Sequence, residues 1–84
     1  MAKKLIGKIT HVFPKINVVV LKLDADLKVG EKISIEKDGQ IIEQIVESLQ
    51  VEHQNIKIAK SGTEAGMKVS KTVKEGSEVY RITE

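Results

Sequence analysis

Short stretches in which apolar and polar residues alternate run along most of the chain, and they predict β-strands. Residues 32–37 (KISIEK) alternate strictly, the pattern of a strand with one face toward a core. Residues 4–13 alternate more loosely, with Leu5, Ile9 and Phe13 on the apolar side and Gly7 indicating a bend or bulge. The β-branched run 16–23 (INVVVLKL) predicts a strand buried on much of both faces, forming a hairpin with 4–13. Further strands are expected at 55–60, where Ile56 and Ile58 point inward, and at 67–70 and 78–83.

Residues 40–51 fit two patterns. Their apolar residues recur at helical spacing, at Ile41, Ile42, Ile45, Val46 and Leu49. The preceding Asp38-Gly39 is a strong hairpin signal that requires a strand on each side. We therefore expect a long strand that can carry a bulge, and the helix remains the alternative on periodicity alone.

Three glycines mark corners that lead into strands. Gly30, Gly66 and Gly76 are each followed three residues later by a β-branched residue. Glycine adopts positive φ without a steric penalty, which suits a tight corner. Frequent corners between short strands predict an all-β fold, a small closed antiparallel β-barrel of six to seven strands, because closure removes exposed edges.

Composition narrows the possible classes. The 84 residues make one domain, 1–84, with a core built from aliphatic residues, because aromatic residues are only 2% of the chain. Without cysteine there is neither a disulfide framework nor a thiolate metal site. Neither a signal peptide nor an apolar run long enough for a bilayer is visible, so we expect a cytoplasmic protein with no membrane contact. The net charge of +2 is compatible with nucleic acid without demanding it.

The order of motifs in the second half is similar to that in a known domain. The stretch Val46-Glu47-Ser48, then His53, Ala59 and the corner before Val69, follows the upstream corner at Gly30. Together with the corner at Gly76, this order resembles the second domain of translational GTPases, the elongation factor Tu/1-alpha group. The resemblance implies a translation-factor domain 2 type barrel and a non-catalytic binding module that contacts tRNA, rRNA or a translation-related protein, as in small stand-alone elongation factor-like proteins.

A second resemblance supplies the alternative. A domain of this kind is also similar to the barrel appended to some U32-type peptidases and RNA-hydroxylation proteins. This implies a protein–protein adaptor, or a detached accessory domain of a U32-type peptidase or RNA-modification system. The chain has no G-x-x-x-x-G-K-[ST] stretch, so no nucleotide hydrolysis is expected on it.

Candidate binding residues are mostly basic. We expect a nucleic-acid or partner-binding side, formed by Lys57, Lys60, Lys68, Lys71, Lys74 and Arg81, with His53 as a further contact. Tyr80 belongs to this set as the sole aromatic candidate, so we do not expect bases to be read by stacking. A solvated surface interleaved with Glu75 and Glu78 is the simpler interpretation of the same lysines. The two histidines lie far apart in sequence and lack ligand spacing, so we expect no metal site, no cofactor and no catalytic residue.

Overall fold

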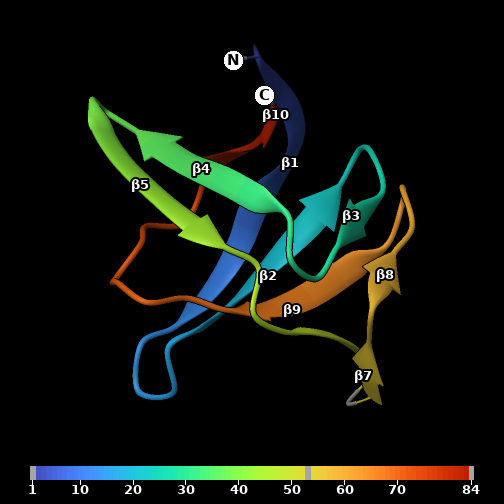
Figure 1. The fold of residues 1–84 in the computed structure, drawn as a ribbon. Coiled ribbons are helices and arrows are strands. Elements are labelled where there is room, and N and C mark those ends of the chain that lie inside the picture. Colours follow the sequence, from blue (N-terminus) through green and yellow to red (C-terminus); the bar gives the residue numbers. More distant parts are fainter. Residues whose placement is uncertain (1, 53, 84) are drawn as a thin grey trace.

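Every regular element in the computed structural model, which describes residues 2–52 and 54–83, is a β-strand. The expected all-β class is therefore confirmed. The ten strands are β1 (Ala2–Phe13), β2 (Val18–Leu23), β3 (Leu27–Lys28), β4 (Lys32–Lys37), β5 (Gln40–Ile45), β6 (Leu49–Val51), β7 (Gln54–Ile56), β8 (Ile58–Ala59), β9 (Glu64–Lys68) and β10 (Glu78–Thr83) (Figure 1). A search of the described residues finds no helix with the length and apolar character needed to cross a membrane.

Eight strands form one antiparallel sheet in the order β5-β4-β10-β1-β2-β9-β6-β7, and β3 pairs with β8 in a separate ribbon. The last strand, β10, lies between β1 and β4. The two ends of the chain are therefore adjacent, as Figure 1 shows, with Ala2 opposite Thr83. The expected hairpin between the first two strands is present, and Asp38 and Gly39 both take positive φ in the turn between β4 and β5.

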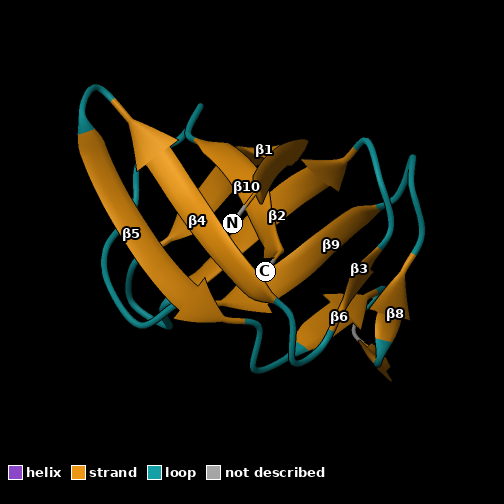
Figure 2. Cartoon of the chain, turned by 45° about the horizontal axis from the view of Figure 1, so that its top comes forward, coloured by secondary structure: helices purple, strands orange, loops and turns teal. Residues whose placement is uncertain are grey.

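The expected closed barrel of six or seven strands is not what forms. Within the described residues the eight-stranded sheet has two free edges, at β5 and β7, although it curls around the core (Figure 2). Val46, directly after β5, continues the pairing with the β4 side, because its N–H donates to the Glu31 carbonyl and its carbonyl accepts from the Gly30 N–H. The next strand, β6, pairs with β9 in another part of the sheet, so β5 is left as an edge.

Residues 40–51 are not one strand, because their first part pairs with β4 and their last part with β7 and β9. They are extended and not helical, as expected, but β5 ends at Ile45 and β6 begins at Leu49. Residues 54–60 are likewise divided, into β7 and β8. Ala59 is buried there, whereas Ile58 is 43% exposed, so the inward position predicted for Ile58 is wrong.

Two irregularities in β1 reset which side chains face the core. The pairing with β10 shifts between Leu5 and Gly7, and the pairing with β2 shifts between Ile9 and His11. Each bulge moves the following side chains to the opposite face. As a result Ile9 is buried while Phe13 and Leu5 are exposed. The aliphatic core is otherwise built from both halves of the sheet, by Ile6, Ile9, Leu21, Leu23, Leu27, Ile33, Leu49, Met67 and Val79.

The three predicted corner glycines differ in conformation. Gly30 and Gly76 have φ of 96° and 84°, which suits a corner. Gly66 instead lies inside β9, opposite Val20 and Gln50, so the corner assigned to it is wrong. The positive φ in this segment belongs to Gly62, at 84°, because the turn comes before β9 and leaves Gly66 in extended backbone.

Candidate functional site

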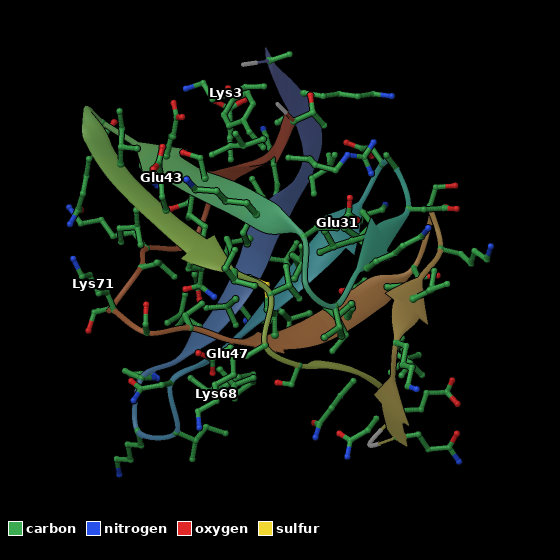
Figure 3. All side chains as sticks on the ribbon, viewed as in Figure 1. Lys3, Glu31, Glu43, Glu47, Lys68 and Lys71 are labelled. Atoms are coloured by element: carbon green, nitrogen blue, oxygen red, sulfur yellow. The ribbon has the colours of Figure 1, made fainter. Side chains whose placement is uncertain are left out.

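The predicted basic side is divided between two parts of the molecule. Lys68 ends β9, and Lys71 and Lys74 follow in the connection to β10, on the left of Figure 1. Lys57 and Lys60 flank β8, on the right. Figure 3 shows Lys68 and Lys71 on the side away from β7 and β8. The lysines therefore do not line one continuous face.

Two of the predicted basic residues contact residues in the loops around β3. The Arg81 guanidinium donates to the Asp26 carbonyl at 2.9 Å and lies 3.7 Å from the Glu31 carboxylate. Lys60 Nζ lies 3.7 Å from the Asp26 carboxylate, which also accepts from the Ser61 N–H. The Arg81 contacts join β10 to the loops on either side of β3, whereas the Lys60 side chain is 74% exposed beside Asp26.

Tyr80 belongs to a polar network on the outer face of the sheet. Lys3 Nζ donates to Glu36 Oε2 at 2.5 Å and lies 5.4 Å from the centre of the Tyr80 ring. Ser34 Oγ donates to the same Glu36 oxygen at 2.9 Å. The hydrogen bond from Lys3, followed by that from Ser34, lowers the pKa of Glu36. Desolvation, followed by the Glu78 and Glu36 carboxylates, raises the pKa of Tyr80. Tyr80 is thus packed against the sheet beside a cation, and its ring is not an open stacking platform.

A hollow of the described surface lies beside the turn between β1 and β2. This groove has a volume of about 400 Å³ and is lined by Phe13, Ile16, Val18, Val20, Gln50, Glu52, Glu64 and Gly66. Val20, Gly66 and Gln50 are opposite one another across β2, β9 and β6. Since Gly66 has no side chain, the middle of this row is left open. Phe13 and Ile16 rise from the turn at one end, 48% and 62% exposed.

The charges of the groove gather at its other end. In the β6–β9 pairing Gln50 is opposite Gly66; Glu52, with a φ of 51°, lies in the turn after β6, and Glu64 is the first residue of β9. Both carboxylates line the groove. Across residues 2–52 and 54–83 neither has a basic nitrogen within 4 Å, although Lys22 pairs with Glu64 in the ladder. The groove is therefore apolar at one end and negative at the other.

Histidine and serine side chains are the remaining candidates for a catalytic or metal-binding role. His53 lies outside the described residues. His11 is exposed, with Nδ1 3.7 Å from the Glu75 carboxylate. The buried hydroxyls of Ser34 and Ser77 donate to Glu36 and to the Lys74 carbonyl. Among the described side chains there is no group of three or more His, Cys, Asp or Glu that could hold a metal ion.

Sequence reasoning missed the groove, because it treated Phe13 as part of the inward face of the first strand. A signal was nevertheless present. Turns usually consist of polar residues, glycine and proline, and the turn Phe13-Pro14-Lys15-Ile16 carries a large apolar residue on each side of its central pair. A second hollow of about 290 Å³ is lined by these four residues.

Comparison with solved structures gives the same fold in a peptidase domain. The C-terminal domain of a Geobacillus thermoleovorans protein described as a U32 peptidase superposes with a TM-score of 0.88, covering 95% of this chain and 93% of that domain at 11% identity. The selenomethionine variant of that domain gives a TM-score of 0.83 over 90% of this chain and 96% of its own, also at 11% identity. At this identity the likeness shows the fold alone.

Sequence comparison finds one curated relative of note. An uncharacterised protease of Methanocaldococcus jannaschii is 36% identical over 80 residues, which is 94% of this chain. The chain spans only 20% of the length of that relative. No protein-family model matches the sequence.

These findings correct the first of the two resemblances. The chain was expected to be similar to the second domain of translational GTPases, and the sequence match and the two structural matches described above are to peptidase proteins instead. The motifs behind that expectation were mainly glycine corners, which many small β-folds share because any tight turn can use them. One of them, at Gly66, is not a corner at all.

Proposed function

We propose that this chain is a non-catalytic accessory module of a U32-type peptidase system, which docks on a catalytic part and acts with it. The observation that carries the proposal is the match of nearly the whole chain both to a domain of a U32 peptidase and to one fifth of a protease. Most of that protease lies outside the match and has room for the catalytic machinery. In this proposal, our chain corresponds to the accessory module and the rest of the protease to the catalytic part.

The surface offers apolar area for such docking. β5 is a free edge of the sheet, and its outward residues Ile41 and Ile45 are 58% and 51% exposed. An edge strand with exposed isoleucines tends to pair or aggregate unless another element covers it. Glu43 lies between the two isoleucines, so a protein partner with both apolar and basic side chains would suit this edge.

The environment of the described hydroxyl and imidazole groups, which are the usual nucleophiles and bases of enzymes, supports a non-catalytic role. The hydroxyls of Ser34 and Ser77 are committed to a carboxylate and a backbone carbonyl. The His11–Glu75 pair is on the surface, with side chains 67% and 62% exposed. This pair therefore lies in open solvent and not in an enclosed site.

The test uses the Methanocaldococcus protease in two forms, intact and shortened by the segment that matches this chain. Size-exclusion chromatography and calorimetry with the purified chain should show a complex with the shortened form. The intact form is the matched control, since its own segment should occupy the docking site. The double substitution Ile41→Ser with Ile45→Ser should abolish the complex.

Two results would overturn the proposal. One is that the chain binds neither form of the protease. The other is that total tRNA competes fully with the shortened protease for the chain, which would favour a nucleic-acid surface.

A further inference from the structure

We propose that the groove beside the β1–β2 turn binds an extended polypeptide segment, one that carries an apolar side chain and, separated from it by one residue, an arginine or lysine. This groove is a surface of the chain alone, so its ligand goes beyond the accessory role proposed above and does not depend on it. The apolar turn, the open row at Gly66 and the pair of carboxylates each favour such a segment at a different point along the groove.

The end of the groove at the turn suits an apolar side chain. Phe13 and Ile16 leave about half or more of their surface in water, although both are large hydrophobic residues. Val18 and Val20 continue the apolar lining along β2. The tip is held in place, because the Val69 N–H donates to the Asn17 carbonyl at 2.8 Å. A preformed apolar surface of this kind gains free energy when a ligand displaces water from it.

The middle of the groove is open because it lacks a side chain. A methyl group at Gly66 would lie 3.8 Å from the Val18 side chain and 3.8 Å from the Gln50 carbonyl oxygen. These are ordinary contact distances, so a side chain would fit here and would fill the floor. The glycine leaves this space to a ligand.

The far end suits a cation. Glu52 and Glu64 both line the groove, Glu52 from the turn after β6 and Glu64 from the start of β9. Two carboxylates that line the same groove attract a guanidinium or ammonium group, which can form charge-assisted hydrogen bonds with them. The same carboxylates oppose the binding of phosphate, so they favour a polypeptide over a nucleic acid as the occupant.

The spacing of the two ends fits an extended chain. The row that holds Val18 and the row that holds Glu64 are four residues apart along β2, roughly 13 Å. In an extended peptide, alternate side chains point the same way and are separated by roughly 7 Å. The flexible arm of an arginine or lysine covers the remaining distance. The volume of about 400 Å³ accommodates two such side chains but no folded domain.

The experiment is a fluorescence-anisotropy titration of the intact chain with labelled glycine–serine peptides. The first peptide carries leucine and arginine separated by one serine, the second replaces the arginine with glutamate, and the third replaces the leucine with serine. We expect the first to bind about fivefold tighter than either of the others. The advantage over the glutamate peptide should shrink as salt is added.

Matched variants locate the site. Glu52→Gln with Glu64→Gln should reduce binding of the first peptide about fivefold. Asp38→Asn with Glu43→Gln changes the net charge equally at a distance from the groove and should leave binding unchanged. Ile16→Ser should weaken binding, whereas Ile41→Ser, also at an exposed isoleucine, should not. Circular dichroism would confirm that each variant is folded.

The proposal is overturned if the three peptides bind equally, if none binds at millimolar concentration, or if the groove and control variants have the same effect. A short single-stranded RNA that binds tighter than the first peptide would also overturn it. Because Ile16 serves the groove and Ile41 the β5 edge, failure here leaves the docking experiment with the protease unaffected.

Discussion

The contact between Lys3 and Glu36 shows how one ion pair can join two strands that do not pair with each other. Lys3 belongs to β1 and Glu36 to β4, with β10 between them. Their side chains meet over β10 beside the Tyr80 ring. Ser34 adds a second hydrogen bond to the carboxylate. The pair therefore links the two sides of the central strand on the outer face.

We predict that Glu36→Gln destabilises the fold in a pH-dependent way. The folded protein holds the pKa of Glu36 below its ordinary value of 4.5. The stabilisation is therefore present above that value and is lost as the pH falls through the folded-state pKa. Urea denaturation should show a stability difference between wild type and variant near neutral pH, and a smaller one well below pH 4.5.

Glu43→Gln is the control for this prediction. Glu43 lies on the neighbouring strand and is 3.8 Å from Lys32, a longer and more exposed pair. Its substitution should have the smaller effect at neutral pH. An equal loss in the two variants, or a loss from Glu36→Gln that persists unchanged in acid, would contradict the role assigned to Lys3 and Ser34.

For the candidate site, the orientation of the Phe13 side chain could not be predicted from the sequence. Alternation places Leu5, Ile9 and Phe13 on one side only if the strand has no bulge. Gly7 indicated one irregularity in the strand, but no residue of the sequence indicated the second, between Ile9 and His11. The orientation of Phe13, and with it the groove, therefore depended on a register shift set by pairing with β2.

At the scale of elements, the strands β1 and β9 each contain a glycine, Gly7 and Gly66, and the two glycines have different surroundings. A methyl group at Gly7 would clash with the backbone carbonyl oxygen of Lys22, on the paired strand. At Gly66 the same methyl group would meet its neighbours at ordinary contact distance. Neither glycine has the positive φ of a corner. Close approach of the backbone therefore explains Gly7, and an open surface explains Gly66.

We predict opposite outcomes for alanine at these two positions. Gly7→Ala should lower the free energy of unfolding by about 2 kcal/mol, because a strand must shift to remove the clash. Gly66→Ala should leave stability unchanged or raise it by about 0.5 kcal/mol, because glycine loses more entropy on folding. Chemical denaturation followed by circular dichroism measures both. A destabilised Gly66→Ala, or a neutral Gly7→Ala, would show that the strand spacing is different from that described.

Strands whose ends are defined by nearby residues were predicted well, and strands whose ends depend on distant residues were not. The bounds of β4 and β10 agree with the predicted 32–37 and 78–83, because strict alternation or a nearby turn defines them. Residues 40–51 could not be divided correctly from the sequence. The division follows from pairing partners far away in the sequence, since the first part pairs with β4 and the last part with β9.

At the scale of the whole molecule, sheet closure and function were the least predictable features. The strand order follows from long-range pairing, above all the insertion of β10 between β1 and β4, and no local pattern specifies that. Small β-folds with glycine corners also serve many different proteins, so corners alone indicated the wrong family. Function has to be argued from surfaces, and the surfaces depend on the complete fold.

The position of β10 leads to a final prediction about cooperativity. Val79 is fully buried in β10, the strand that joins β1 to the β4–β5 hairpin. Val79→Ala should lower the free energy of unfolding by about 2 kcal/mol. If the sheet folds as one unit, amide hydrogen exchange should speed up equally in β4 and in β9, although β9 does not touch β10 in the strand order.

Thr83→Ala, at an exposed position of the same strand, is the control and should change neither the free energy of unfolding nor the exchange rates. Faster exchange confined to β4 and β5 would mean that the hairpin unfolds separately, and that the free β5 edge is the least stable part of the proposed docking surface.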